Sequence, residues 1–297
     1  MTHDKAGHTG TPLRLGSRIL GPDEPTVMAI INRTPDSFYD RGAAYAADQA
    51  LERVAEFVHD GADIVDIGGV KAGYGDVVSV REEVRRTSAF VAEVRSRYPD
   101  IVISVDTWRA EVARELCQQG ADLLNDTWAG ADPEVAEVAA DFGVGLVCSH
   151  TGGLAPRTDP HRVAYDDVVA DVIERTSALA ARAVRLGVRR DAVLVDPTHD
   201  FGKNTWHSLE LTRRLDEVVA TGWPVLVAVS HKDFIGETLD LPVDRRMAGT
   251  LATTAVCAWQ GARVFRAHEV VETRQVLQMV AAIRGARPPA VARRGLA

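Results

Sequence analysis

Short runs of apolar, mostly β-branched residues alternate with longer segments of helical periodicity along almost the whole chain. Eight runs are typical of strands, at 26–31, 63–68, 101–106, 122–126, 144–149, 192–196, 224–230 and 262–266. Eight amphipathic segments are typical of helices, near 46–59, 80–97, 109–118, 133–141, 166–186, 207–220, 244–260 and 270–284. Because the runs are continuously apolar, they indicate parallel strands that helices bury on both faces.

The junctions between these segments repeat as well. DGADIVDI, QGADLLND, FGVGLVCS and QGARVFRA each place a Gly just past a helix and then enter a strand, at 60–67, 119–126, 142–149 and 260–267. Gly favours this position because it adopts the left-handed conformation that ends a helix. Strict β–α alternation of this kind predicts an α/β fold, a single (β/α)8 TIM barrel. An open doubly wound sheet is the alternative, although no GxGxxG turn follows the first run.

The domain boundaries follow from the outermost segments. A length of 297 residues is compatible with two domains or with one large barrel, and eight β–α units favour the barrel. We expect the barrel at 18–285, a flexible N-terminal tail at 1–17 and a C-terminal tail at 286–297. The segment LRLGSRIL, at 13–20, also has the character of a strand that would plug the bottom of the barrel.

Charge and cysteine content narrow the partners. The chain has 34 Lys and Arg against 42 Asp and Glu, a net charge of −8, so it offers no overall cationic field to nucleic acid. No apolar run approaches the roughly 18 residues of a membrane span, and the first residues lack a secretory signal. Cys117, Cys148 and Cys257 show no zinc-binding spacing and are typical of buried free thiols. We expect a cytoplasmic protein with no nucleic-acid or membrane partner.

Polar residues stand where the predicted strands end. They are Asn32, Asp66, Asp106, Asn125, Asp126, His150, Asp196, Ser230, Lys232, Arg266 and His268. Active sites of (β/α)8 barrels lie at the carboxyl ends of the strands, so these side chains should converge on one mouth. A ring of carboxylates, amides and cations suits a small polar heterocycle that carries both donors and acceptors.

These segments also carry a family resemblance. MAIINRTPDSFYDRG, at 28–42, resembles the first signature of the dihydropteroate synthases. Later motifs of that family follow in the same order, as ISVDTWRAEVA (103–113), GADLLNDTWAG (120–130), DPTHDFGK (196–203), SHKDFIGE (230–237) and FRAHEVVETRQ (265–275). The resemblance covers about residues 18–285. It implies a homodimeric barrel that joins a dihydropterin methyl diphosphate to 4-aminobenzoate and releases diphosphate.

The resemblance also implies the roles of individual residues. It assigns the pterin pocket to Asp106, Asn125, Asp196, Phe201, Lys232 and Arg266. A carboxylate and an amide can pair with the amino-pyrimidinone edge of a pterin, and a cation can stack on the ring. The resemblance places Asn32, Arg266 and His268 around the diphosphate, with Asn32 also near its Mg²⁺. Lys203 matches a supporting lysine, and we expect structural roles for Asp126 and His150.

The chain departs from the family pattern after the second strand. It has DIGGVKAGYG, at 66–75, where the family has DxGGESTRPG. Glu, Ser, Thr, Arg and Pro are thus replaced by Val70, Lys71, Ala72, Gly73 and Tyr74. The replaced hydroxyl and guanidinium groups would act near the leaving diphosphate, where loss of one donor typically costs about 100–1,000-fold in rate. Arg33, Arg41 and Lys71 are charges that could compensate.

Two further departures lie near the expected pterin pocket. SHKDF replaces the family's SRKSF, which places His231 and Asp233 near the expected position of the 4-aminobenzoate carboxylate. DPTHDFGK replaces DPGIGFGK, which introduces Thr198, His199 and Asp200. Two carboxylates repel each other by about 1–4 kcal/mol at 4 Å, depending on screening.

The sequence therefore predicts a divergent dihydropteroate synthase paralogue that binds a pterin and has weak or no synthase activity. One alternative is an active synthase of folate biosynthesis in which the additional cations replace the missing groups. A more distant alternative is an unrelated barrel enzyme that acts on a phosphorylated metabolite.

Overall fold

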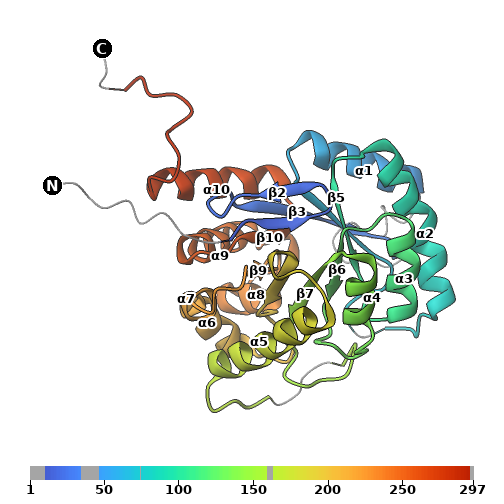
Figure 1. Cartoon of the computed structure of the whole chain (residues 1–297). Helices are drawn as coiled ribbons and strands as arrows, with labels where there is room; N and C mark the ends of the chain where they lie inside the picture. The colour runs from blue at the N-terminus through green and yellow to red at the C-terminus, as the bar shows by residue number, and fades with distance from the viewer. Residues whose placement is uncertain (1–10, 35–46, 74, 159–162, 295–297) are drawn as a thin grey trace.

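The computed structural model describes residues 11–34, 47–73, 75–158 and 163–294 (Figure 1). An antiparallel hairpin of β1 (Leu13–Leu15) and β2 (Arg18–Leu20) comes first. Eight parallel strands follow: β3 (Thr26–Asn32), β4 (Ile64–Gly68), β5 (Val102–Asp106), β6 (Leu123–Asp126), β7 (Gly145–Ser149), β8 (Val193–Asp196), β9 (Leu226–Val227) and β10 (Val264–Ala267). The helices are α1 (Ala47–His59), α2 (Val80–Arg97), α3 (Ala110–Gln118), α4 (Val135–Phe142), α5 (Val168–Leu186), α6 (Thr205–Arg213), α7 (Leu215–Val219), α8 (Asp233–Leu239), α9 (Met247–Gln260) and α10 (Val270–Ile283).

The eight parallel strands close into a barrel. Their hydrogen-bonded order is β8-β7-β6-β5-β4-β3-β10-β9. The two ends of this order meet, because the Val195 N–H donates to the Pro224 carbonyl at 2.9 Å and Val195 forms a parallel bridge with Val225. The predicted (β/α)8 barrel is confirmed, and the open doubly wound sheet is excluded.

The predicted elements differ from the observed ones near the C-terminal half. The helix expected near 207–220 is divided into α6 and α7, because Arg214 leaves the helical conformation with φ −110° and ψ 26°. A seven-residue helix that the periodicity did not predict, α8, follows β9. The helix expected from 244 begins at Met247, after a short 3-10 turn at Val243–Arg245.

The hairpin closes the bottom of the barrel. Leu13 and Leu15 are fully buried and pack with Met28, Ile64 and Leu123 inside the barrel. The domain therefore begins no later than Leu13, and the flexible tail predicted for 1–17 is wrong for residues 13–17. Residues 1–10 of that tail lie outside the described residues, and residues 286–294 of the predicted C-terminal tail are exposed.

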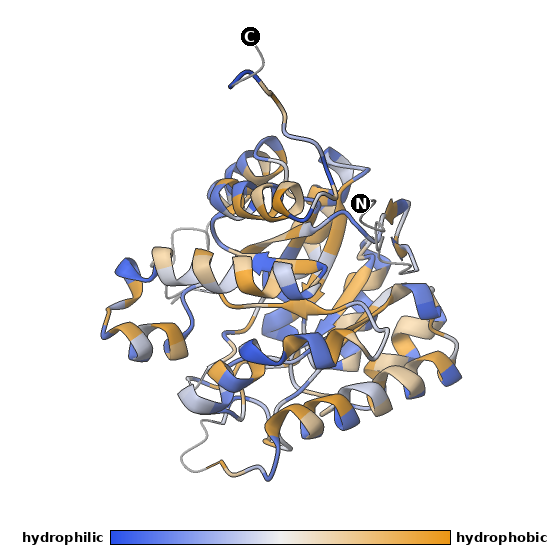
Figure 2. Ribbon diagram, turned by 90° about the vertical axis from the view of Figure 1, so that its left-hand side faces the viewer, coloured by the Kyte–Doolittle hydropathy of each residue, from blue (hydrophilic) through white to orange (hydrophobic). Residues whose placement is uncertain are grey.

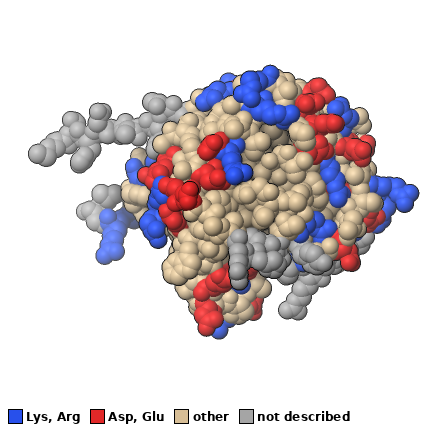
Figure 3. Space-filling model, turned by 90° about the horizontal axis from the view of Figure 1, so that it is seen from below, with Lys and Arg blue, Asp and Glu red and all other residues tan. Residues whose placement is uncertain are grey.

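Apolar residues concentrate in the strands, whereas the surrounding helices mix apolar and polar residues (Figure 2). On the face seen in Figure 3, basic and acidic side chains are interspersed. No helix in the described ranges is long and apolar enough to cross a membrane.

The hairpin leads to a prediction about stability. Leu15→Ala should lower the free energy of unfolding by about 2–5 kcal/mol, because it leaves a cavity where the barrel interior is packed. Ile19→Ala is the matched control, since Ile19 is 57% exposed in the same hairpin and its loss should change stability by less than about 0.5 kcal/mol. Urea unfolding followed by tryptophan fluorescence measures both. Equal stability of the two variants would contradict the packed plug.

Candidate functional site

A cavity of about 620 Å³ opens at the carboxyl ends of the barrel strands. Most of the predicted site residues line it, namely Asn32, Asp106, Asp196, Phe201, Lys232, Arg266 and His268. Asn125 does not line the cavity; it is buried at the end of β6. The strand ends thus bring one amide, two carboxylates, two cations, an imidazole and an aromatic ring to a single cavity.

Arg266 is held at the floor of this cavity by two aspartates. Its Nε donates to Asp66 Oδ2 at 2.6 Å, and its Nη2 donates to Asp106 Oδ2 at 3.1 Å. Asp66 is fully buried and also accepts hydrogen bonds from Ser104 Oγ at 2.6 Å and Asn125 Nδ2 at 3.1 Å. Sequence reasoning placed Asp66 at a strand end but gave it no role. It is the anchor of Arg266, and the alignment of strand ends was the only sequence signal for it.

Asp106 and Asp196, which both line the cavity, have pKa values close to neutral pH. Burial raises the pKa of Asp106 to about 7 and that of Asp196 to about 6. Among the described residues, the buried Oδ1 of Asn125 has no hydrogen-bond partner. An unpaired buried acceptor is uncommon in proteins, and a bound ligand or water usually satisfies it. Behind the Asp66–Arg266 pair, Asn125 therefore keeps an acceptor that no described residue uses.

An aromatic and cationic wall stands beside the carboxylates. Lys232 Nζ lies 4.3 Å from the centre of the Phe201 ring, and burial lowers the pKa of Lys232. Trp128 packs edge-on against Phe201, with ring centres 5.2 Å apart. Asp126 fixes the Trp128 turn by accepting from the Trp128 N–H at 3.0 Å and the Gly130 N–H at 2.8 Å, which is a structural role as expected. Trp128 stands in one of the quoted motifs, but sequence reasoning assigned it no role.

The turn after β8 adopts an unusual backbone conformation. Thr198, Asp200 and Gly202 have φ values of 55°, 70° and 60°. A positive φ is rare for a β-branched residue and costs on the order of 1–3 kcal/mol. The Thr198 side chain offsets part of this cost, because its Oγ1 donates to the Asp196 carbonyl at 2.8 Å and accepts from the His150 N–H at 3.0 Å.

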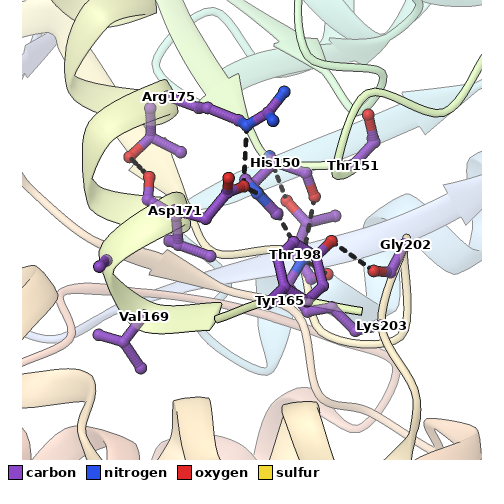
Figure 4. A network of polar contacts seen from close by, with 12 residues as sticks. His150, Thr151, Tyr165, Val169, Asp171, Arg175, Thr198, Gly202 and Lys203 are labelled. Atoms are coloured by element: carbon purple, nitrogen blue, oxygen red, sulfur yellow. Dashed lines mark hydrogen bonds and ion pairs between the residues drawn. The ribbon is translucent and has the colours of Figure 1, made fainter. Parts of the chain in front are cut away.

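A buried network centred on Lys203 supports the same turn (Figure 4). Lys203 Nζ donates to the carbonyls of His150, Thr198 and Phe201 at 3.1, 3.1 and 2.9 Å. It also lies 2.8 Å from His150 Nδ1, while His150 Nε2 lies 2.6 Å from Asp171 Oδ1. Burial lowers the pKa of His150 to about 4, so the neutral ring donates to Asp171 from Nε2, and its Nδ1 shares the three Lys203 N–H groups with the carbonyls. Lys203 and His150 therefore hold the turn from behind and do not line the cavity.

The loop after β4 presents few polar groups to the cavity. Val70, Lys71, Ala72 and Gly73 all line it. Their side chains bring no hydroxyl and no guanidinium, and Lys71 contributes an ammonium. Residues 70–73, the part of this loop that the structure describes, thus bring none of the missing hydroxyl and guanidinium groups to the wall.

Arg33 does not replace those groups. Its side chain is buried against Phe90, with the guanidinium 4.7 Å from the ring centre, and its Nε donates to the Arg86 carbonyl at 3.4 Å. It is not among the residues that line the cavity. The hypothesis that Arg33 compensates is therefore not supported, and Arg41 lies outside the described residues.

His231 also lines the cavity, and a hydrogen-bond partner at each ring nitrogen fixes its side chain. Its Nε2 lies 2.8 Å from Glu269 Oε1, and its Nδ1 lies 2.9 Å from the Val243 carbonyl. Burial lowers the pKa of His231, but the hydrogen bond and charge of Glu269 outweigh burial and the net pKa is raised. Since both partners are acceptors, both ring nitrogens must carry protons for the two hydrogen bonds to form together. His231 is thus held by an acceptor at each ring nitrogen, and this arrangement favours its protonated form.

Comparisons with known proteins identify the relatives of this chain. The family model described as "Pterin binding enzyme" matches residues 28–268. The protein named inactive dihydropteroate synthase 2 of Mycobacterium leprae is 58% identical over 287 residues, covering 95% of this chain and 99% of that protein. Its namesake in Mycobacterium tuberculosis is 55% identical, covering 95% and 90%. The crystal structure of Yersinia pestis dihydropteroate synthase in complex with a sulfonamide drug has a TM-score of 0.87 and 33% identity, covering 93% of this chain and 100% of that one.

The Lys203 network leads to a prediction. Lys203→Met should lower the free energy of unfolding by about 2–4 kcal/mol, because three buried carbonyls lose their donor at about 1–3 kcal/mol each, partly offset by removal of a buried charge. Arg185→Met, on the exposed part of α5, is the control and should change stability by less than about 0.5 kcal/mol. Urea unfolding measures both variants. A Lys203→Met protein as stable as the control would show that the network does not hold the turn.

Proposed function

Because the chain belongs to the pterin binding enzyme family, we propose that it is a dihydropteroate synthase-like protein that binds a pterin and carries out the synthase reaction weakly or not at all. The observation that carries this proposal is the wall formed by Val70, Lys71, Ala72 and Gly73, which brings no hydroxyl or guanidinium to the cavity. The names of the two mycobacterial relatives, both called inactive, support the same reading.

The pterin would occupy the inner half of the cavity, formed by Asp106, Asp196, Phe201, Lys232 and Arg266. Ionised Asp196 can accept hydrogen bonds from the amino group and ring N–H of a pterin. Phe201 provides an apolar face for the ring, and Lys232 can donate to a ring oxygen or nitrogen.

The synthase reaction needs more than this binding. Diphosphate must leave, and the charge that develops on it has to be stabilised by donors held in place before the reaction. Asn32, Arg266 and His268 are the residues proposed to lie around the diphosphate. Lys71 lines the cavity and is the one observation that favours the alternative, an active synthase. An ammonium cannot reproduce the planar, bidentate hydrogen bonding of the arginine that the family has in this loop.

Asn32 would be the protein ligand of Mg²⁺ in the diphosphate complex. Within the described ranges, no group of three His, Cys, Asp or Glu side chains is arranged to hold a metal ion. One amide oxygen fits an ion that keeps several waters and takes its other ligands from substrate phosphates. Bound in this way, Mg²⁺ would neutralise charge on the leaving group.

We also propose a cytoplasmic homodimer. Large apolar side chains are exposed on the adjacent helices α9 and α10, including Trp259, Met279 and Ile283. Exposed apolar patches of this kind are typical of protein interfaces. The free and buried state of Cys117 and Cys257 is compatible with a reducing compartment.

Activity measurements test the proposed function. With dihydropterin methyl diphosphate, Mg²⁺ and 4-aminobenzoate, turnover should fall far below the ordinary enzyme rate of about 1 s⁻¹. Changing residues 70–74 together to the family's Glu, Ser, Thr, Arg and Pro should raise turnover by about 100-fold or more, because it restores donors to the leaving group. The same change combined with Arg266→Met should stay inactive. Wild-type turnover near 1 s⁻¹ would support the active-synthase alternative instead.

The pKa of Asp196 leads to a prediction about pterin binding. Below pH 6 the carboxyl is protonated and loses an acceptor, so affinity for 6-hydroxymethylpterin should fall as the pH is lowered from 7.5 to 5. Linkage of binding to one ionisation gives at most about a tenfold loss per pH unit. Asp196→Asn should bind more weakly at pH 7.5 and show a shallower pH dependence. Calorimetry measures both, and an affinity that is constant or higher at low pH would contradict the role of Asp196.

A further inference from the structure

We call the part of the cavity lined by Asp200, His231, Asp233, Val243 and Arg246 its outer half. The guanidinium of Arg246 is hydrogen-bonded there to other groups of the same chain. Arg246 Nη1 donates to Asp233 Oδ1 at 2.7 Å and to the His231 carbonyl at 2.8 Å. The Arg246 side chain is 14% exposed, whereas Asp233 is 80% exposed. The guanidinium is thus buried under a carboxylate that reaches it from the solvent side.

The position of Arg246 is fixed by the backbone around it. A Cβ placed on Gly236 of α8 would lie 2.2 Å from Arg246 Nε, so a larger residue at this position would displace the guanidinium. Arg246 Nε also donates to the Leu241 carbonyl at 3.2 Å. Turning the side chain toward a ligand would break these contacts as well as the ion pair with Asp233.

A second carboxylate uses the backbone donors beside this arginine. Asp200 Oδ2 accepts from the Asp233 N–H at 2.7 Å and from the Phe234 N–H at 3.3 Å. Its other oxygen, Oδ1, accepts from Ser208 Oγ at 3.1 Å. Asp200 holds this place with a φ of 70°, a conformation that favours glycine, so these hydrogen bonds are formed against a backbone cost.

His231 of this wall is also paired, because its Nε2 lies 2.8 Å from Glu269 Oε1. The wall therefore presents the exposed carboxylate of Asp233 to a ligand, while Arg246 Nη1 and Nε and the N–H groups of Asp233 and Phe234 are already bound within the chain. Lys71 lines the cavity from the loop after β4, outside this wall.

We propose that Asp200 and Asp233 occupy the places a ligand carboxylate would take, so that the outer half binds an uncharged aromatic amine in preference to an aromatic amino acid. The proposal rests on the proposed function in one respect, that a pterin fills the inner half. It deepens that function, because it names the chemical class of the second ligand.

Two probes of the same shape separate the classes. 4-Aminobenzamide is neutral and 4-aminobenzoate is an anion, and both are titrated by calorimetry into the full-length protein, with and without saturating 6-hydroxymethylpterin. The wild type should bind the benzamide at least tenfold more tightly than the benzoate. Asp233→Ser frees Arg246 and should raise benzoate affinity about tenfold while leaving benzamide affinity within twofold.

Asp240→Asn is the matched control, since it removes an acid from the end of the same helix, outside the cavity lining, and should leave the preference unchanged. Asp233 is exposed, so its substitution should not impair folding. Equal affinity of the wild type for both probes, as expected if Lys71 receives the carboxylate, would overturn the proposal. So would an unchanged preference in Asp233→Ser, or failure of the wild type to bind the benzamide in either state. Failure of 6-hydroxymethylpterin to bind, with the preference for the benzamide intact in the pterin-free protein, would contradict the proposed function alone.

Discussion

The ion cluster of Arg266, Asp66 and Asp106 is the interaction on which the cavity depends. Asp66 is fully buried, and a buried carboxylate is tolerated only when its charge and lone pairs are matched. Arg266, Ser104 and Asn125 supply that match from β10, β5 and β6. Removing one partner of such a cluster typically costs about 3–5 kcal/mol, so the barrel and its polar floor are stable only together. The geometry of the inner half is thus set before any ligand arrives.

The turn after β8 differs from the family pattern in its side chains, although it carries residues that line the cavity. Thr198 and Asp200 adopt left-handed conformations where the resembling family has glycine. Hydrogen bonds of their side chains offset part of the backbone strain. Thr198 accepts from the His150 N–H, just after β7, and Asp200 accepts from the Asp233 N–H at the start of α8. The backbone that carries Phe201 and Asp196 is therefore kept, and its new side chains are used for internal contacts.

Much of this organisation could be predicted from the sequence. Apolar runs and helical periodicity located the eight strands, because each strand is buried on both faces and its pattern is local. Short α8 has too few residues to show a period, whereas the apolar pattern of 13–20 does indicate the strand that plugs the barrel, although the predicted tail at 1–17 overlaps it. The sequence does not show Asp66 as an anchor, because its partner Arg266 lies 200 residues away. It offers Arg33 as a compensating charge, because the stacking of Arg33 on Phe90 is visible only in three dimensions. Residues at strand ends were found, whereas pairings between distant loops were not.

Binding and catalysis can separate in such a cavity because they use different groups. Residues that contact the pterin ring stabilise substrate and transition state alike, so they give affinity without speeding the reaction. Groups around a leaving diphosphate act mainly as its charge develops, and losing them reduces rate with little effect on ground-state binding. Here Asp106, Asp196, Phe201, Lys232 and Arg266, the residues proposed to contact the ring, all line the cavity, whereas the loop after β4 lines it with Val70 and Gly73. Differences of this kind convert an enzyme into a binding protein without any change in its fold, since none of the altered residues belongs to the ion cluster that holds the barrel floor.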